Sequence, residues 1–501
     1  MRGFTARRIR LGALFSSSVF ATACFSVCIL GAPAQVNPPP APATNPPAQT
    51  LSPTPPPASP TPMPTPPPII VDPPAAGVPV GFDQTLHVSQ VLGNISVAVA
   101  NPALLNAVID QDARTIALTG KAVGMTTLTV SDQRGLTALV PIRVAYNAGS
   151  IADSVWLQIT GNPASPQFIA EQAAAIATKM ASARPGAAIV APPDDLVVNG
   201  PLALDDLRTV DVPVLIQGNE YFPVNGTTHV LIENRAAPRI SPKNLLVSDF
   251  PESLTENGVL FTAALDRSQP RRFLYFHYNP AGQPDRRIVL RAENPSAEPA
   301  VLQFISGEGG PSPNEMEVGH DSTQRFLVRL VQNEGNIIVI PAQTTITLFE
   351  QDLPAKAIVS NLLQLRVLDG GQIHLTLLAQ DAADSPGAPI SDAMLLTSKV
   401  KHARGVYQIA EFHYDRLWNL TDPYLELPIG QIPLPNLIKG ESLAGDYGVL
   451  QSFVVTIQNP LHSPQAIAIY ENPRGGRATG TFLIDGVLVQ SHQTPAYSQY
   501  K

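Results

Sequence analysis

Short segments in which apolar residues alternate with polar ones recur along most of this chain. In the stretch from 82 to 146, the segments "ISVAVA", "TIALTG", "TTLTV" and "LVPIRV" each place every second side chain on one apolar face, as Ile116 and Leu118 show. A period of two is the spacing of a β-strand that packs one face on a core. Gly, Asn and Asp separate the segments, so an antiparallel β-sandwich is predicted for residues 81–147.

The same stretch carries a more specific pattern. Asn101-Pro102 precedes a strand that ends at Gly120, and Gly124 and Gly135 flank the strand "TTLTV". This spacing resembles bacterial Ig-like domains of the second group and the related N-terminal domain of pilus-formation and secretin-type proteins. The resemblance implies a surface or envelope module that spaces, adheres or assembles. Its glycines are then expected to serve turns and not catalysis.

The first 34 residues have the pattern of an export signal. Four arginines precede an apolar stretch from Leu11 to Leu30, and residues 32–34 form a small-x-small cleavage site before Gln35. The mature chain is predicted to begin at Gln35. The alternative that stays open is an uncleaved anchor, because the apolar stretch approaches the roughly 20 residues that span a bilayer.

Both cysteines of the chain, Cys24 and Cys28, lie inside the predicted export signal. Cleavage would leave a mature protein without a thiol, so disulfides, thiolate metal sites and cysteine nucleophiles are not expected. Export without disulfides is typical of a secreted, periplasmic or cell-surface protein of a bacterium whose cores are stabilised by packing.

Residues 35–80 are dominated by Pro, Ala, Thr and Ser and carry almost no charge. Such a segment cannot bury a core and favours extended polyproline II, at about 3.1 Å per residue. We predict that residues 35–80 are a spacer, and that this spacer is disordered from Gln35 to about Gly77. It would hold the folded domains roughly 100 Å from the N-terminus.

The charge balance bounds the partners. The formal net charge is −8 at pH 7, and charged residues make up only 14% of the chain, so nucleic acid is not expected as a partner. Membrane contact is expected only through the N-terminal segment, if it stays uncleaved. An envelope protein or a polysaccharide remain open as partners.

One helix is predicted, in a segment of mixed α and β structure at residues 148–240. Ser165 is a suitable N-cap with Pro166 at the first helical position, and apolar residues recur at helical spacing until Pro185-Gly186. Strands "SVWLQIT" and "AAIVAP" flank the helix, which predicts a β-α-β unit. A glycine-rich phosphate loop does not open the helix, so nucleotide binding is not expected.

The rest of the chain returns to strand period, with "RFLYFHY", "RFLVRLV" and "NIIVIP" among the predicted strands, and it contains an internal repeat. Asn294-Pro295 and Asn459-Pro460 each precede a second proline four residues after the first, and Gly258 and Gly405 begin weaker upstream matches. We predict two β-sandwich repeats, 241–385 and 386–501, which superpose through the two Asn-Pro turns. The region resembles uncharacterised secreted bacterial β-proteins. The second copy lacks segments equivalent to strands of the first, so either it is truncated or the first copy lends strands to it.

Residues with catalytic potential are few. In "RFLYFHYN", His277 is interpreted as a packed strand residue with one hydrogen bond, and the neighbouring arginines 271, 272, 286, 287 and 291 as a solvated edge. His320-Asp321-Ser322 contains the residue types of a triad, but neighbours on an extended chain do not converge. His413 and Asp415 share a strand face without a third ligand. "GEGGPSPN" and "PRGGRATG" are interpreted as turns. We predict no catalytic, cofactor-binding or metal-binding residue, and no cofactor.

The sequence therefore predicts a mostly β, multi-domain, secreted or cell-envelope protein with a structural or adhesive, non-enzymatic role. Two alternatives stay open. One is a secreted hydrolase or carbohydrate-active enzyme whose acids, among Asp266, Glu293, Asp415 and Glu441, converge in the fold. The other is a pilus or secretin accessory protein, which the resemblance of residues 82–146 implies.

Overall fold

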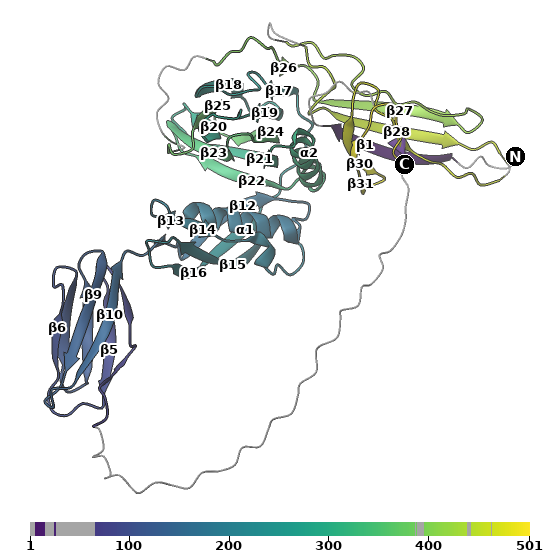
Figure 1. Ribbon diagram of the computed structural model, residues 1–501. Coiled ribbons are helices and arrows are strands. Elements are labelled where there is room, and N and C mark those ends of the chain that lie inside the picture. The colour runs from purple at the N-terminus through teal and green to yellow at the C-terminus, as the bar shows by residue number, and fades with distance from the viewer. Residues whose placement is uncertain are drawn as a thin grey trace, which may run out of the picture.

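The computed structural model describes residues 6–15, 25–26, 66–385, 387, 395–437, 442–461 and 463–501. These residues are mostly β, with two α-helices, α1 (Pro166–Met180) and α2 (Glu315–Gln332), and a 3-10 turn at Pro193–Asp195 (Figure 1). The predicted fold class is confirmed. Within the described ranges, neither helix has the length and apolar character needed to cross a bilayer.

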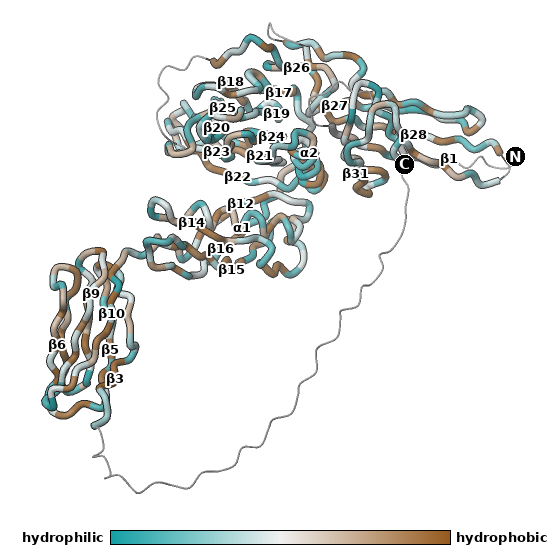
Figure 2. The backbone as a smooth tube through the Cα atoms, in the orientation of Figure 1, coloured by the Kyte–Doolittle hydropathy of each residue, from teal (hydrophilic) through white to brown (hydrophobic). Residues whose placement is uncertain are grey.

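The N-terminal domain is the predicted β-sandwich. One sheet has the order β3 (Ile70–Asp72), β5 (Asp83–Ser89), β8 (Thr115–Gly120), β7 (Leu105–Asp110), and the other the order β4 (Ala76–Pro79), β10 (Thr137–Ala145), β9 (Gly124–Ser131), β6 (Ser96–Val99). Figure 2 shows hydrophobic and hydrophilic residues alternating along these strands. Leu86, Ile116, Leu128 and Ile142 are fully buried between the sheets.

The domain begins earlier than the sequence predicts. β3 and β4 precede residue 81, and their side chains Val71 and Val78 are buried in the sandwich core. The prediction that the spacer extends to residue 80, with disorder to about Gly77, is therefore wrong at its C-terminal end. The segments Ile70–Asp72 and Ala76–Pro79, which lie on either side of Pro73-Pro74, complete the two sheets. Residues 35–65 of the predicted spacer lie outside the described residues.

The predicted α+β segment and the first predicted repeat share one ten-stranded sheet. Its order is β14 (Ala188–Val190), β15 (Asp206–Gln217), β16 (Val224–Asn234), β12 (Ser154–Thr160), β22 (Gly335–Ile340), β21 (Ala300–Ser312), β24 (Ile358–Asp369), β19 (Arg271–Tyr278), β17 (Asn244–Ser248), β26 (Arg404–Tyr407). The two segments join where β12 pairs with β22. α1 begins as predicted, since the Ser165 hydroxyl accepts the N–H of Phe168 at 3.3 Å. The short strands β11 (Gly149–Ser150) and β13 (Ser182–Ala183) pair beside it.

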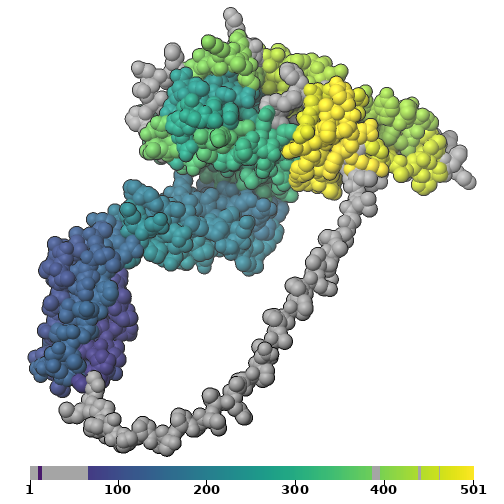
Figure 3. Space-filling view, in the orientation of Figure 1, coloured from purple at the N-terminus to yellow at the C-terminus, as the bar shows by residue number. Residues whose placement is uncertain are grey.

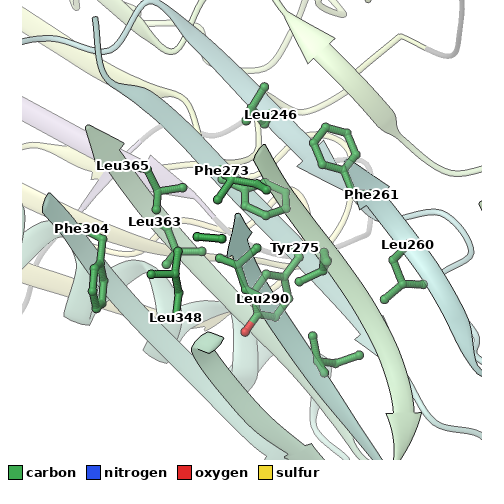
Figure 4. Packing of buried hydrophobic residues seen from close by; sticks show 14 of the residues in the cluster. Leu246, Leu260, Phe261, Phe273, Tyr275, Leu290, Phe304, Leu348, Leu363 and Leu365 are labelled. Carbon is green, nitrogen blue, oxygen red and sulfur yellow. The ribbon is translucent and has the colours of Figure 1, made fainter. Parts of the chain in front are cut away.

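A four-stranded sheet packs on the ten-stranded one. Its order is β18 (Gly258–Leu265), β25 (Ile373–Asp381), β20 (Arg286–Asn294), β23 (Thr344–Leu353). Figure 4 shows the core between the two sheets, with Phe261, Phe273 and Tyr275 among leucines. The rings of Phe261 and Phe273 stack with their centroids 5.2 Å apart. This core is the largest in the described chain and holds the strand that carries His277.

The segment "RFLVRLV" is part of a helix, so its prediction as a strand is wrong. α2 begins at Asn314, whose side chain accepts the N–H of Glu317 at 3.4 Å, and ends at Asn333, which has a left-handed φ of 55°. These are the capping residues that a helix prefers. Val318, Phe326 and other apolar residues face the sheet at helical spacing. The run of alternating apolar letters hid this period.

The glycines of "GEGG" are not in a turn, which corrects the prediction for this segment. Gly307 and Gly309 lie within β21, directly under α2. A Cβ atom at Gly309 would lie 1.9 Å from the carbonyl oxygen of Val318, and one at Gly307 would lie 2.3 Å from that of Ser322. The helix can approach the strand this closely only because both residues lack a side chain.

The C-terminal sheet contains the start of the chain. Its order is β27 (Glu411–Asn419), β28 (Leu450–Gln458), β1 (Ala6–Phe15), β30 (Ala478–Ile484), β31 (Val487–Thr494), and β2 (Phe25–Ser26) pairs with β29 (Tyr470–Glu471). Figure 3 shows the yellow C-terminal residues packed against the green body. β26 lies within the predicted second repeat, but it pairs with β17 and is therefore part of the ten-stranded sheet.

The two Asn-Pro turns are alike, but the strands around them are not. The side-chain amides of Asn294 and Asn459 donate to the carbonyls of Glu298 and Ser463, at 2.8 and 3.0 Å. However, β20 lies between two antiparallel neighbours, β23 and β25, whereas β28 lies between parallel β27 and antiparallel β1. The prediction that the two copies superpose as sandwiches is therefore wrong beyond the turn itself.

Candidate functional site

Three side chains with metal-ligating atoms meet at one end of the ten-stranded sheet. The Nδ1 atom of His402 lies 2.8 Å from Oε2 of Glu252 and 3.6 Å from Oδ2 of Asp249. One ligand atom from each of the three residues lies within 4.8 Å of the others. An imidazole and two carboxylates are a donor set that divalent transition metals accept.

The strand pairing brings these residues together. In the antiparallel pair of β17 and β26, Ser248 lies opposite Arg404. The ladder continues by one hydrogen bond, because the N–H of Asp249 donates to the carbonyl of Ala403 at 2.9 Å. Asp249 and His402 therefore stand at the end of one ladder although about 150 residues separate them in the sequence.

The turn that carries Glu252 is anchored on both sides. Arg404 donates to the carbonyl of Phe250 at 3.1 Å, and its guanidinium lies 4.7 Å from the centroid of the Phe250 ring. The ring Nδ1 of His277 donates to the carbonyl of Pro251 at 2.9 Å, and the N–H of Tyr278 donates to that of Glu252 at 2.8 Å. These backbone bonds fix the loop, so the ligand atoms are held by rigid elements.

Burial and charge perturb the cluster. Burial raises the pKa of Asp249 to about 7, against the favourable interaction with His402, and its Oδ1 atom is buried without a hydrogen-bond partner. The Asp249 carboxylate raises the pKa of His402, and Glu252 and Glu315 add to this effect. The carboxylate of Glu252 lies nearer to the His402 ring than that of Asp249 does, so the short contact is the one between His402 and Glu252. The cluster is acidic and has an unsatisfied buried oxygen, which a cation would satisfy.

The donors would need to separate slightly to hold a metal. Bonds of 2.0–2.2 Å in a tetrahedral site place ligand atoms roughly 3.3 Å apart. The separation between His402 and Asp249 is close to this value, and the contact between His402 and Glu252 would have to open. Sequence analysis missed this site because no motif spacing joins residues 249, 252 and 402. Only the pairing of β17 with β26 reveals it.

A divalent ion is expected to stabilise the protein through this cluster. Zn²⁺ at about 100 times its dissociation constant would add roughly 2.7 kcal/mol to the free energy of unfolding. Thermal unfolding with and without Zn²⁺ measures the effect, and His402→Gln should abolish most of it. His374→Gln is the matched control, because His374 also lies beside a carboxylate, at 3.7 Å from Glu293, but is exposed and belongs to no three-ligand group within the described part of the chain. An equal Zn²⁺ shift in both variants would contradict the prediction.

His277 is the packed strand residue that the sequence predicts, with one more hydrogen bond than expected. It is fully buried in β19. Because its Nδ1–H donates to Pro251, its Nε2 accepts from the Ser248 hydroxyl, at 3.2 Å. Burial lowers the pKa of His277 to about 4. The ring supports the loop between Asp249 and Glu252 and is not itself a ligand.

The other weighed residues have separate partners. In α2, His320 contacts Gln490 and Thr479, whereas the Ser322 hydroxyl donates to the carbonyl of Gly307 at 2.7 Å. His413 and Asp415 lie on β27, and the ring of His413 is 3.6 Å from the carboxylate of Glu411. The side chains of His320 and Ser322 therefore do not converge on one site, and His413 and Asp415 have no shared contact among the described residues.

The acids of the hydrolase alternative lie apart or are paired locally. Asp266 follows β18 and forms an ion pair with Arg271, which contributes to its lowered pKa after the hydrogen bond from Ser268. Glu293 lies on β20 and Asp415 on β27, in a different sheet. Glu441 lies outside the described residues.

The prediction that the arginines around His277 form a solvated edge is wrong in part. Arg272 is fully buried, and Arg286 is buried with its guanidinium donating to Asn279 and to the carbonyl of Leu254. Arg287 does lie at the surface and pairs with Asp352 at 2.8 Å. The alternation of β19 and β20 turns some of these arginines inward, which composition alone does not show.

Comparison with known proteins places the N-terminal domain. Residues 74–145 match the family model described as the pilus formation protein N terminal region. This confirms the resemblance to pilus-formation proteins for that part of the chain, whose limits agree with the sandwich. No curated protein matches the chain.

Solved structures share little with the whole chain. Fibronectin(III)-like modules of Clostridium thermocellum CbhA are 14% identical, cover 33% of this chain and 94% of theirs, and give a TM-score of 0.17. A mouse cadherin-23 fragment is 14% identical over 33% of this chain and 64% of its own, with a TM-score of 0.13. The Bacteroides ovatus protein SGBP-B is 11% identical over 58% of this chain and 71% of its own, with a TM-score of 0.14. At these scores the likeness does not extend to the arrangement of this chain.

Proposed function

We propose that this chain is an exported cell-envelope protein whose β domains have a structural or adhesive role at the end of a Pro-rich stalk. The observation that carries the proposal is the pilus-formation domain at residues 74–145, which directly follows the Pro-rich segment. A domain in that position is held away from the N-terminus and is free to contact other envelope components.

The surface of this domain supports a binding role. On the outer face of the β10 and β9 pair, Leu139 and Met125 are each 68% exposed. Exposed apolar residues that share one sheet face are typical of surfaces that contact other proteins. Asp266, Glu293 and Asp415, the acids of the hydrolase alternative that the structure describes, do not form such a shared feature, so the binding role is the better supported function.

Export and envelope retention are the properties that test the proposal. Cells that express the chain should hold it in the envelope fraction, and mass spectrometry of the purified protein should give Gln35 as its first residue. A cytosolic protein that keeps Met1 would contradict the proposal. An envelope protein that keeps Met1 would favour the uncleaved anchor over the cleaved signal.

A pilus or secretin accessory role is the second candidate, and the family match favours it. The two roles differ in what retains the protein. In cells that lack the secretin, an accessory protein should lose its place in the envelope, whereas a general structural module should stay there.

A further inference from the structure

The C-terminal sheet depends on a strand from the predicted export signal. β1 lies between β28 and β30 and is antiparallel to both. It pairs from Ala6 opposite Gln458 to Ala13 opposite Gln451 on one side, and from Leu11 opposite Ile484 to Phe15 opposite Gly480 on the other. One more backbone hydrogen bond joins β1 to the turn after β30, because the N–H of Asp485 donates to the carbonyl of Arg10 at 2.8 Å.

The strand also contributes to the core of this sheet. Leu11 and Ala13 of β1 are buried, whereas Arg10 is exposed. β1 therefore shows the alternation that is typical of a strand with one face on a core. Phe453, Phe482 and Ile429 pack in the same cluster. Without β1, the facing edges of β28 and β30 would lie roughly 10 Å apart with unpaired backbone groups and exposed apolar side chains.

The two fates of this segment exclude each other. If residues 1–34 are removed during export, Ala6–Phe15 cannot fill the sheet of the exported protein. The neighbours of β20, which are β23 and β25, come from its own region of the chain, whereas β28 has β1 as its second neighbour. Export would leave a slot one strand wide.

The walls of the slot are held by the main body. Leu450 at the start of β28 packs in one cluster with Phe326 and Leu327 of α2. On the other side, the ring of His320 in α2 contacts Thr479 of β30 at 2.5 Å and Gln490 of β31 at 2.8 Å. Both walls are therefore attached to the same helix whether or not a strand lies between them.

We propose that the slot between β28 and β30 is a strand-accepting site. Ala6–Phe15 fills it before export, and an extended segment of another exported protein fills it afterwards; this rests on the proposed export. The segment would run antiparallel to β28, carry apolar or small residues at alternate positions, and have no Pro at its paired positions. Every copy of this chain loses the same strand, and the many prolines of its spacer interrupt the row of N–H donors that a central strand needs, so the donor is a different polypeptide.

Hydrogen exchange with a synthetic peptide tests the site. The probe is the peptide of residues 6–15, and the protein is the exported form, purified from the envelope as a single polypeptide from which any bound partner has been removed. Residues 450–458 and 478–484 should exchange at least tenfold faster in this form than in the unprocessed chain, and the peptide should restore their protection. A peptide with Gly12→Pro should not, because it removes a backbone donor. β20 serves as the internal control for folding and should be equally protected in all samples.

Each outcome decides the proposal. Slow exchange of both segments in an exported protein that starts at Gln35, with neither peptide nor any other polypeptide bound, would show that the slot closes by itself and would overturn it. An envelope protein that retains residues 6–15 would overturn it too, while leaving the envelope function intact. The full-length variant with Leu11→Asp and Ala13→Asp is an independent arm. Its two segments should exchange as fast as in the exported form and regain protection with the peptide, and a lack of response in this variant would count against the site.

Discussion

Replacing Arg272 by alanine is expected to lower the free energy of unfolding of the central domain, which the ten-stranded and four-stranded sheets form, by about 3–5 kcal/mol. The guanidinium is fully buried and forms an ion pair with Glu411 at 2.7 Å. It also donates to the carbonyl of Ala410 at 2.8 Å and to Gln364 at 3.1 Å. Its loss leaves the mostly buried carboxylate of Glu411 without its guanidinium partner and opens a cavity beside Phe326, whose ring centroid lies 5.3 Å from the guanidinium carbon.

The free energy of opening, measured by hydrogen exchange in β19 and β24, reports this change. Arg287→Ala is the matched control: Arg287 pairs with Asp352 at the surface, so its loss should cost at most about 1 kcal/mol. The double variant Arg272→Met with Glu411→Met should recover much of the stability, because it removes both charges. A loss as small as that of Arg287→Ala would contradict the buried ion pair.

The position of Arg272 also shows what the sequence could predict. The period-two segments of residues 82–146 predict the strands of the sandwich, and Ser165-Pro166 predicts the start of α1, because these signals are local. The direction of an arginine on a strand buried on both faces is not local. It depends on which sheet covers each face, and "RRFLYFHY" carries large side chains on both.

The misread helix and the missed cluster have different causes. In α2, "RFLVRLV" fits a strand and a helix, and the deciding signals are the caps at Asn314 and Asn333. The cluster of Asp249, Glu252 and His402 has no local signal, because antiparallel pairing of distant strands creates it. The place of β1 is equally non-local, and a segment with an export pattern gives no reason to expect a sheet partner.

Acidification from pH 6.5 to 4 is expected to destabilise the central domain through His277, by about 3 kcal/mol. Burial, with a smaller contribution from the nearby charge of Arg404, lowers the pKa of this ring to about 4. In the unfolded chain the pKa is about 6.5. Between these two values the unfolded state binds more protons than the folded state, so this contribution is fully present above about pH 6.5 and is lost as the pH falls towards 4.

The structural reason is that both ring nitrogens are already committed. Nδ1 donates its proton to Pro251, and Nε2 accepts one from Ser248. A second ring proton would lie on Nε2, against the hydroxyl hydrogen, in a site without a carboxylate in contact with the ring.

His277→Asn separates this contribution from the other groups that titrate in the same range. Asparagine keeps a donor near the Pro251 carbonyl but does not titrate, so the variant should be less stable than the natural protein at pH 7 and should lose less stability on acidification. The measured quantity is the difference between the two proteins in the free energy of opening of β19, followed by hydrogen exchange from pH 7 to 4. The difference should shrink steadily below pH 6.5, since only the natural protein must keep its ring unprotonated. Parallel curves over the whole range would show that His277 is not held neutral by the fold, and the support it gives to the loop would then have to come from packing alone.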